Sequence, residues 1–208
     1  MAVGLFGVSF GVLAGSAGFE PLAAVVMSVT TFAGSAQFAA ISVLGAGGTL
    51  AAAVGAAVLL NARYGPMGLA AAPAFEGSVW RRLLQSQLVV DEAWALSIVE
   101  EERGRRFDRR ILVGAGLLLY AAWVAGTTAG VIAGGALGDP EDLGLDAAFP
   151  ALFLALLVGQ LGSRPAATAA LVGGAIALVL IPVAPAGVPV IVAVAACLIG
   201  LRGREERS

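Results

Sequence analysis

Long uncharged runs separated by short charged segments dominate the hydrophobic and polar pattern of the chain. No charged residue occurs in 21–62, in 111–138 or in 165–201. A helix needs about 20 apolar residues to cross a bilayer, so the first and last of these runs are each long enough for two crossings. Turn-forming residues interrupt both runs near the middle, at GAGG (45–48) and at PVAPAGVP (182–189). The pattern therefore predicts two helices in each of these two runs.

The whole pattern predicts an all-α fold: a polytopic transmembrane helix bundle of about seven or eight helices, forming one transporter domain over 1–208. Membrane-spanning strands would alternate polar and apolar residues, and these runs do not. Some helices are expected to be interrupted at mid-membrane. For 83–100 the pattern leaves open whether the segment crosses fully. The predicted spans are 2–18, 21–44, 49–72, 83–100, 111–137, 147–163, 165–182 and 187–201.

Composition supports a membrane protein and excludes several chemistries. The chain is 59% hydrophobic and 12% charged, and its mean hydropathy is +0.94. It has no histidine, which excludes a histidine-containing triad and removes the most frequent metal ligand, and no cofactor is expected. All 12 basic residues are arginines and, apart from Arg63, they lie at segment ends and not on one face, so no nucleic-acid partner is expected. The single cysteine, Cys197, lies in an apolar run and is assigned a packing role.

The distribution of arginines predicts the orientation in the cytoplasmic membrane. Arginines crowd the segment 102–110 and the C-terminal 202–207, and Arg164 marks a short turn. The positive-inside rule places these three in the cytoplasm, including the C-terminus. The acidic loop at 138–146 then faces outside. Inside and outside loops that alternate along the chain would place the arginine pair at 81–82 outside, against this rule. The pair therefore sits at a membrane interface, or the segment 83–100 is not a full crossing.

A glycine repeat marks the first predicted helix. Gly7, Gly11 and Gly15 recur every four residues. Such a stripe of small residues lets another helix approach closely in lipid. The alternative is that the repeat only reflects a glycine-rich chain.

Arg63 lies inside the predicted span 49–72, near the bilayer midplane. Placing an arginine there costs roughly 2.5–3.5 kcal/mol on insertion scales. Pro66 cannot donate a helical hydrogen bond and leaves the carbonyl of Ala62 without its helical partner. The helix is therefore predicted to be kinked or broken beside Arg63.

Two acids lie at the centre of the next predicted span. Asp91 and Glu92 are adjacent, and Gln87 precedes Asp91 by one helical turn on the same face. If the spans 49–72 and 83–100 are antiparallel neighbours, Arg63 and Asp91 lie at nearly equal depth and can meet. Adjacent carboxylates point about 100° apart on a helix, so only one needs to face Arg63. The other would favour its protonated form, which makes Glu92 or Asp91 a candidate for proton coupling.

A third feature is the small-residue patch in TTFAGSAQFAA, residues 30–40. Gly34, Ser35 and Ala36 precede Gln37 in the middle of a predicted span. A helix that unwinds there would present backbone N–H and C=O groups to a cavity, as transporters with interrupted helices do.

Each polar residue also has a structural interpretation. Arg63 and Asp91 can form a buried salt bridge that only locks two helices. Gln37 and Asn61 can be hydrogen-bonding links between helices, and Pro66 can be only a kink. The sequence leaves these alternatives open.

Four segments of the chain resemble one known family in the same order. GFEPLAAVVMSVTTFAGSAQFAAISVL (18–44) is similar to its pattern Gly-x-x-x-x-x-Ala-x-x-Met-Ser followed by Phe-Ala-Gly-x-x-Gln-Phe. LLNARYGPMGLA (59–70) contains its Asn-x-Arg-His/Tyr motif, VVDEAWAL (89–96) its Asp-Glu before an aromatic residue, and GLDAAFPALFLALL (144–157) continues the likeness. The chain thus resembles the large subunit of AzlC-type (LIV-E) branched-chain amino acid exporters.

This resemblance implies a secondary transporter that exports valine, leucine, isoleucine or methionine with a small AzlD-type membrane subunit. It also implies that the chain begins late, because family members usually carry a basic N-terminal tail before the position of Met1. The opening MAVGLFGV lacks the basic start of a signal peptide, so the first apolar run is expected to be kept as a span.

A branched-chain amino acid has a carboxylate, an ammonium group and an aliphatic side chain. Its site needs a cation, an anion or carbonyls, and an apolar pocket. Arg63 is the predicted carboxylate receptor with Asp91 as its resting partner, and Phe32, Phe38 and Trp94 are the predicted apolar flank. The predicted substrate-binding residues are Arg63, Asp91, Asn61, Gln37, Gly34 and Ser35, and the coupling candidates are Glu92 and Asp91.

Three other classes of function compete with this one. A passive channel or an efflux protein for another small solute remains open. An intramembrane enzyme using Asp91 and Glu92 is disfavoured, because adjacent carboxylates on one helix cannot converge as a dyad. A purely structural subunit is disfavoured by the cost of burying unused charges.

Overall fold

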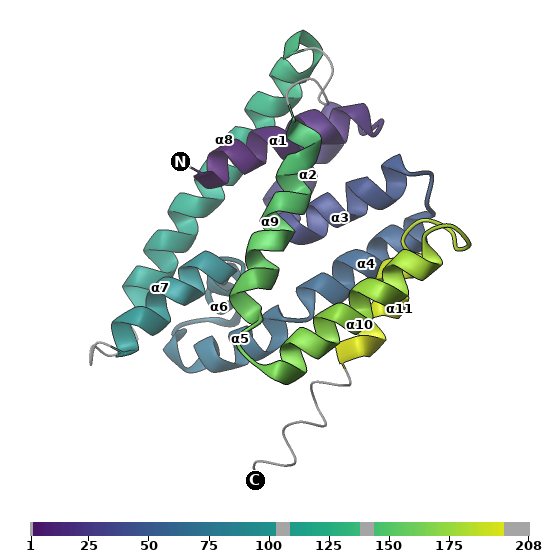
Figure 1. The fold of residues 1–208 in the computed structure, drawn as a ribbon. Coiled ribbons are helices and arrows are strands. Elements are labelled where there is room, and N and C mark those ends of the chain that lie inside the picture. Colours follow the sequence, from purple (N-terminus) through teal and green to yellow (C-terminus); the bar gives the residue numbers. More distant parts are fainter. Residues whose placement is uncertain (1, 103–108, 138–143, 198–208) are drawn as a thin grey trace.

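A computed structural model describes residues 2–102, 109–137 and 144–197, and every regular element in these residues is helical (Figure 1). The all-α prediction is confirmed. The helices are α1 (Ala2–Ser16), α2 (Pro21–Thr31), α3 (Gly34–Gly45), α4 (Leu50–Asn61), α5 (Tyr64–Ala71), α6 (Val79–Ser86), α7 (Asp91–Glu102), α8 (Arg109–Leu137), α9 (Leu145–Gln160), α10 (Arg164–Leu180) and α11 (Val188–Ala193), with 3-10 turns at Ala72–Ala74 and Val194–Ala196.

The turn-forming residues divide the long apolar runs where the sequence predicts. Between α3 and α4, Gly47 has a positive φ of 77°, and the Thr49 side chain accepts a hydrogen bond from the N–H of Ala52 to cap α4. Between α10 and α11, Gly187 has a φ of 90° and precedes the first residue of α11. Both predicted divisions are confirmed.

Two predicted spans are each interrupted inside. The segment 21–44 contains α2 and α3, and the segment 49–72 contains α4 and α5. The prediction of interrupted helices is confirmed, and the break beside Arg63 falls where it was predicted. The unwound residues of the first break are Phe32 and Ala33, however, and Gly34 to Ala36 already belong to α3.

Within the described residues, α8 is the one helix both long and apolar enough to cross a membrane, over Arg109–Gly134. Only 28% of its most apolar stretch is buried inside the protein, unlike the core helix of a soluble domain. The other apolar helices are shorter, so the number of crossings stays a prediction. The segments 103–108, 138–143 and 198–208, on which much of the predicted orientation depends, lie outside the described residues.

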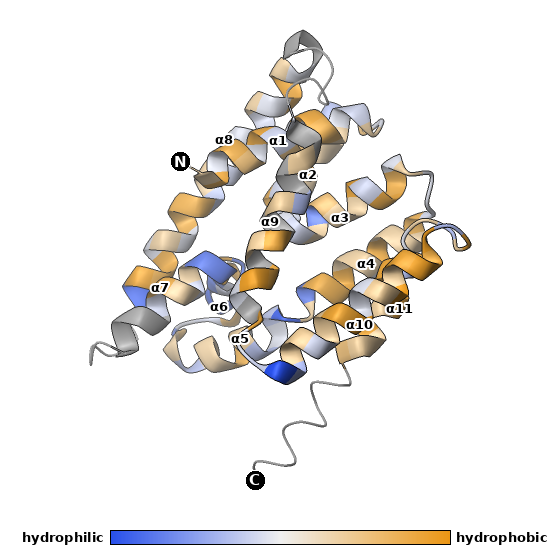
Figure 2. Ribbon diagram, in the orientation of Figure 1, coloured by the Kyte–Doolittle hydropathy of each residue, from blue (hydrophilic) through white to orange (hydrophobic). Residues whose placement is uncertain are grey.

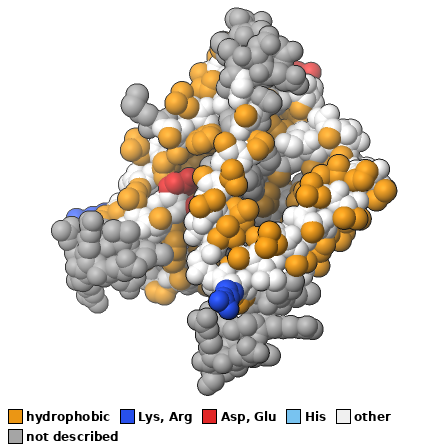
Figure 3. All heavy atoms as spheres, viewed as in Figure 1, with side chains coloured by type: hydrophobic (Ala, Val, Ile, Leu, Met, Phe, Trp, Pro, Cys, Tyr) orange, Lys and Arg blue, Asp and Glu red, His pale blue; other side chains and the backbone are white. Residues whose placement is uncertain are grey.

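Large aliphatic side chains cover much of the outer surface. Leu22, Ile132 and Leu171 are each more than 70% exposed. Hydrophobic residues are frequent along most helices (Figure 2), and orange side chains spread over the visible face with few charges among them (Figure 3). A surface of this kind suits lipid or another apolar partner better than water.

Helices α1 and α8 pack with their backbones in close approach. A Cβ added at Gly7 would lie 2.7 Å from the carbonyl oxygen of Trp123, and one added at Gly126 or Gly130 would collide with the backbone of α1. Gly11 meets the backbone of α8 in the same way. The predicted close-approach role is confirmed for Gly7 and Gly11 but is wrong for Gly15, whose Cβ position has no neighbour within 4 Å in the described part of the chain.

The segment 83–100 is not one helix. α6 ends at Ser86, and α7 begins at Asp91, with 87–90 between them. The prediction that Gln87 and Asp91 share a helical face is therefore wrong. The Gln87 side chain instead donates a 2.7 Å hydrogen bond to the carbonyl of Thr30 at the end of α2.

Phe32 ends α2 in the left-handed region, with φ 41° and ψ 50°. It is the one non-glycine residue with positive φ in the described part of the chain. Its ring is buried and meets Tyr120 edge to face at 5.0 Å, so packing holds a strained backbone in place.

Because a left-handed conformation is costly for every residue with a Cβ, Phe32→Gly is expected to be more stable than Phe32→Ala by about 0.5–1 kcal/mol. Both variants lose the ring, so both should melt below the parent protein. Thermal unfolding of the two variants in one detergent measures the difference. An alanine variant as stable as the glycine variant would show that the backbone at 32 is not strained.

Candidate functional site

Arg63 lies in the break between α4 and α5. Asn61 is the last residue of α4 and Tyr64 the first of α5. The carbonyl of Ala62 lacks its helical partner, as predicted, but it accepts a 3.1 Å hydrogen bond from the N–H of Gly65. Pro66 has no N–H to donate to this carbonyl, and the tighter turn through the N–H of Gly65 satisfies the carbonyl instead.

The guanidinium of Arg63 forms a two-pronged ion pair with Asp91. Nη2 lies 2.6 Å from Oδ2, and Nε lies 3.1 Å from Oδ1. This bidentate geometry is the strong form of an arginine–carboxylate pair. The predicted meeting of the two residues is confirmed. Both side chains remain about one-third exposed, so the pair borders open space.

Further partners complete the cluster around the guanidinium. Nη2 donates to the Ser35 hydroxyl at 2.8 Å and to the Tyr64 hydroxyl at 3.4 Å, and Nη1 donates to the carbonyl of Leu60 at 3.3 Å. The guanidinium carbon lies 5.0 Å from the centre of the Tyr64 ring, within cation–π range.

Three helix breaks meet at this cluster. Ser35 is in the first turn of α3 after the α2–α3 break, Arg63 is in the α4–α5 break, and Asp91 begins α7 after the α6–α7 break. The carboxylate of Asp91 thus sits at a helix N-terminus, where the helix dipole favours negative charge. Interrupted helices that point ends and polar groups at one place are a known way to hold an ionic substrate.

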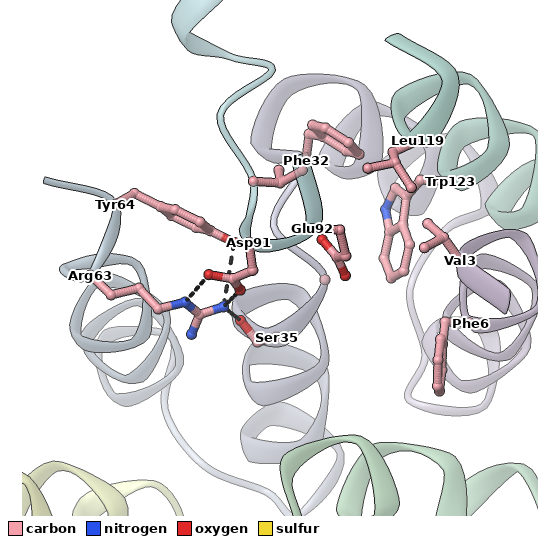
Figure 4. Close-up of a pocket in the computed structure, with 12 residues that line it drawn as sticks. Val3, Phe6, Phe32, Ser35, Arg63, Tyr64, Asp91, Glu92, Leu119 and Trp123 are labelled. Carbon is pink, nitrogen blue, oxygen red and sulfur yellow. Dashed lines mark hydrogen bonds and ion pairs between the residues drawn. The ribbon is translucent and has the colours of Figure 1, made fainter. Parts of the chain in front are cut away.

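The cluster forms one wall of a cavity of about 70 Å³. Figure 4 shows the ion pair with Ser35 and Tyr64 on one side, and Trp123, Leu119, Val3 and Phe6 on the other. The lining residues are Val3, Phe6, Phe32, Gly34, Ser35, Arg63, Tyr64, Val90, Asp91, Glu92, Leu119 and Trp123. The cavity is charged at one end and apolar at the other.

Five of the seven predicted site residues line this cavity: Gly34, Ser35, Arg63, Asp91 and Glu92. Both acids do so, whereas the sequence required only one of them to face Arg63. Gln37 and Asn61 do not line it. The side-chain oxygen of Asn61 is buried at the end of α4 with no hydrogen-bond partner in the described structure.

Gln37 is fully buried in a network that links three helices. Its Nε2 donates to Ser28 on α2 at 2.9 Å, and its Oε1 accepts from the indole of Trp123 on α8 at 3.1 Å. The Ser28 hydroxyl also bonds the Thr127 hydroxyl at 2.9 Å. These contacts match the alternative that Gln37 is a hydrogen-bonding link between helices.

The aromatic flank is only partly as predicted. Phe32 lines the cavity, but Phe38 is fully buried in the core and Trp94 packs against the same core from its edge. Sequence reasoning missed Trp123 and Tyr64. Both could have been found from the sequence. A tryptophan inside an apolar span needs an acceptor for its N–H, and the phenol of the residue after Arg63 adds a hydroxyl beside the charge.

No group of three metal-ligating side chains occurs within the described residues. The arrangement instead offers one cation, two carboxylates, two hydroxyls and an apolar wall. These groups can bind a small molecule that carries both charges and an aliphatic part.

Comparison with known proteins gives a family and several related chains. The family model described as AzlC protein matches residues 1–137, which contain every residue that lines the cavity. The chain is 34% identical over 179 residues to an uncharacterized membrane protein of Archaeoglobus fulgidus, covering 82% of this chain and 74% of the relative. It is 29% identical over 193 residues to the inner membrane protein YgaZ of Escherichia coli, covering 85% of this chain and 76% of the relative. It is 27% identical over 156 residues to an uncharacterized membrane protein of Helicobacter pylori, covering 75% of this chain and 68% of the relative. No solved structure matches the chain.

Proposed function

The chain belongs to the AzlC family, and on this premise we propose that it is the large subunit of a secondary transporter that exports branched-chain or other hydrophobic L-amino acids. Its relatives are named membrane proteins, which supports a transporter-type membrane protein. The proposed substrates are valine, leucine, isoleucine and methionine. The proposed location is the cytoplasmic membrane, with the C-terminus in the cytoplasm and a small AzlD-type membrane subunit as partner.

The observation that carries this proposal is the Arg63–Asp91 pair at the charged end of a half-apolar cavity. An incoming carboxylate can replace Asp91 on Arg63 and accept a hydrogen bond from Ser35. The ammonium group can then bind Asp91 and Glu92, while the aliphatic side chain lies toward Trp123. Arg63 and Asp91 each keep an opposite charge throughout, which avoids leaving either ion uncompensated at membrane depth.

The size of the cavity indicates that this is a resting arrangement. Its volume of about 70 Å³ has room for a few water molecules. Typical small-molecule pockets have roughly 300–1,000 Å³. Substrate entry therefore requires the ion pair to open, which is consistent with Asp91 as the resting partner of Arg63.

Counterflow tests the proposal against a passive channel. The chain and its small partner are expressed together, and membrane vesicles are loaded with unlabelled valine. A carrier should then draw labelled valine transiently above its equilibrium level, because outward and inward movements share one site. Vesicles with the small subunit alone are the control. Label that only equilibrates would indicate a pore, and no valine movement at all would overturn the proposal.

A further inference from the structure

Trp123 forms the wall of the cavity opposite the ion pair, and the packing around it leaves the indole almost no freedom (Figure 4). The side chain is 4% exposed. Its ring stacks on Phe10 at 5.9 Å with an interplanar angle of 28°, and it meets Phe38 nearly edge to face at 6.2 Å. These two rings are buried, so the indole cannot retreat into the core.

A hydrogen bond fixes the orientation of the indole as well. Nε1 donates to Gln37 at 3.1 Å, and Gln37 is itself held by Ser28. Rotation of the ring would leave a buried N–H without an acceptor, which is costly in an apolar interior. The network that links α2, α3 and α8 therefore also positions one wall of the cavity.

Gly34 sets the distance between this wall and the charged end. A Cβ at Gly34 would lie 2.9 Å from Cη2 and 3.2 Å from Cζ3 of the indole, so only glycine permits the contact. The next residue, Ser35, accepts the hydrogen bond from Arg63. The indole edge and the guanidinium are thus both held against the first turn of α3, at a fixed separation.

We propose that Trp123 and Gly34 determine which amino acid side chains the transporter accepts, with the indole as the end wall of the side-chain pocket. This inference rests on the proposed function, because it assumes that Arg63 and Asp91 hold the backbone charges of the substrate. A rigid wall at a fixed distance from that anchor accepts aliphatic side chains of limited size. It excludes the larger aromatic ones.

The test is a counterflow competition between amino acids that differ only in side-chain size. Trp123→Leu shortens the wall and should raise the phenylalanine-to-valine transport ratio roughly tenfold or more, the usual range for added space in an apolar pocket. Gly34→Ala adds a methyl group to the lining and should shift preference the other way, raising the alanine-to-leucine ratio. Trp94→Leu is the matched control, since Trp94 packs against the core without lining the cavity, and its ratios should stay at the parent values.

A purely structural role for Trp123 would lower transport of every amino acid by the same factor. If the Trp123→Leu variant still transports valine but keeps the phenylalanine-to-valine ratio of the parent protein, the inference is overturned and the proposed function stays intact. If Trp123→Leu does not accumulate, the Gly34→Ala ratios decide in the same way. A parent protein that shows no counterflow of any hydrophobic amino acid would instead overturn the proposed function, and the inference with it.

Discussion

Replacing Arg63 with glutamine is expected to reduce valine export by a factor between roughly 30 and 4,000, the range that corresponds to losing one partner of a hydrogen-bonded charge pair, about 2–5 kcal/mol. Glutamine keeps donors near Ser35 but removes the positive charge that receives the substrate carboxylate. Arg63→Lys should recover only part of the activity, because an ammonium group cannot make the two-pronged contact seen with Asp91. Initial export rates, normalised to the amount of folded protein, measure both effects.

The paired control separates substrate contact from a structural lock. Arg63→Asp combined with Asp91→Arg restores an ion pair between the same two positions. If the pair only joins the α4–α5 break to α7, the exchanged pair should restore folding and transport together. If Arg63 contacts substrate, the exchanged protein should fold but not export. Wild-type export by a folded Arg63→Gln variant would contradict the proposed role of Arg63.

The meeting of Arg63 with Asp91 could be predicted because two unlike charges in apolar surroundings have few other ways to avoid a large desolvation cost. That argument uses the charges, which the sequence shows directly, and the assumption that the two segments are neighbours. The divisions at 45–48 and 182–189 could be predicted for a similar reason, since glycine and proline act locally on the backbone.

The break between α6 and α7 could not be predicted, because it contains no glycine or proline. The residues QLVVDE read as a continuous helix, and the contact that accompanies the break is tertiary, from Gln87 to the carbonyl of Thr30. The α2–α3 break was placed two residues too late for a related reason. Phe32 adopts a left-handed conformation that its own residue type disfavours, and its packing against Tyr120 compensates.

The apolar wall of the cavity was missed because it depends on how distant helices pair. Trp123 reaches the cavity only because α8 lies against α1 and α2, and Gln37 on α3 turns toward the indole only in that arrangement. The glycines at 7 and 11 predicted that some helix would approach α1 closely. They did not say which helix it would be.

A valine at Gly126 is expected to prevent stable folding, with a loss of about 3 kcal/mol or more. The Cβ of any larger residue there would collide with the carbonyl of Gly4, and a backbone atom cannot move aside as a side-chain tip can. Helix association in lipid depends heavily on close packing, so separating α1 from α8 removes a main contact of the fold. It would also disperse the cavity, since Val3 and Phe6 come from α1 and Trp123 comes from α8.

Gly114→Val is the matched control for this change. It places the same side chain in the same helix, at a position where an added Cβ has no neighbour within 4 Å among the described residues. Both variants have the same cost of valine in a helix, so the difference between them isolates the contact with α1. Size-exclusion profiles and thermal unfolding of the detergent-extracted proteins should show a parent-like Gly114→Val and an aggregated or early-melting Gly126→Val. Equal stability of the two variants would mean that α1 and α8 do not pack through their glycines, and that the apolar wall of the cavity is not held in the way described.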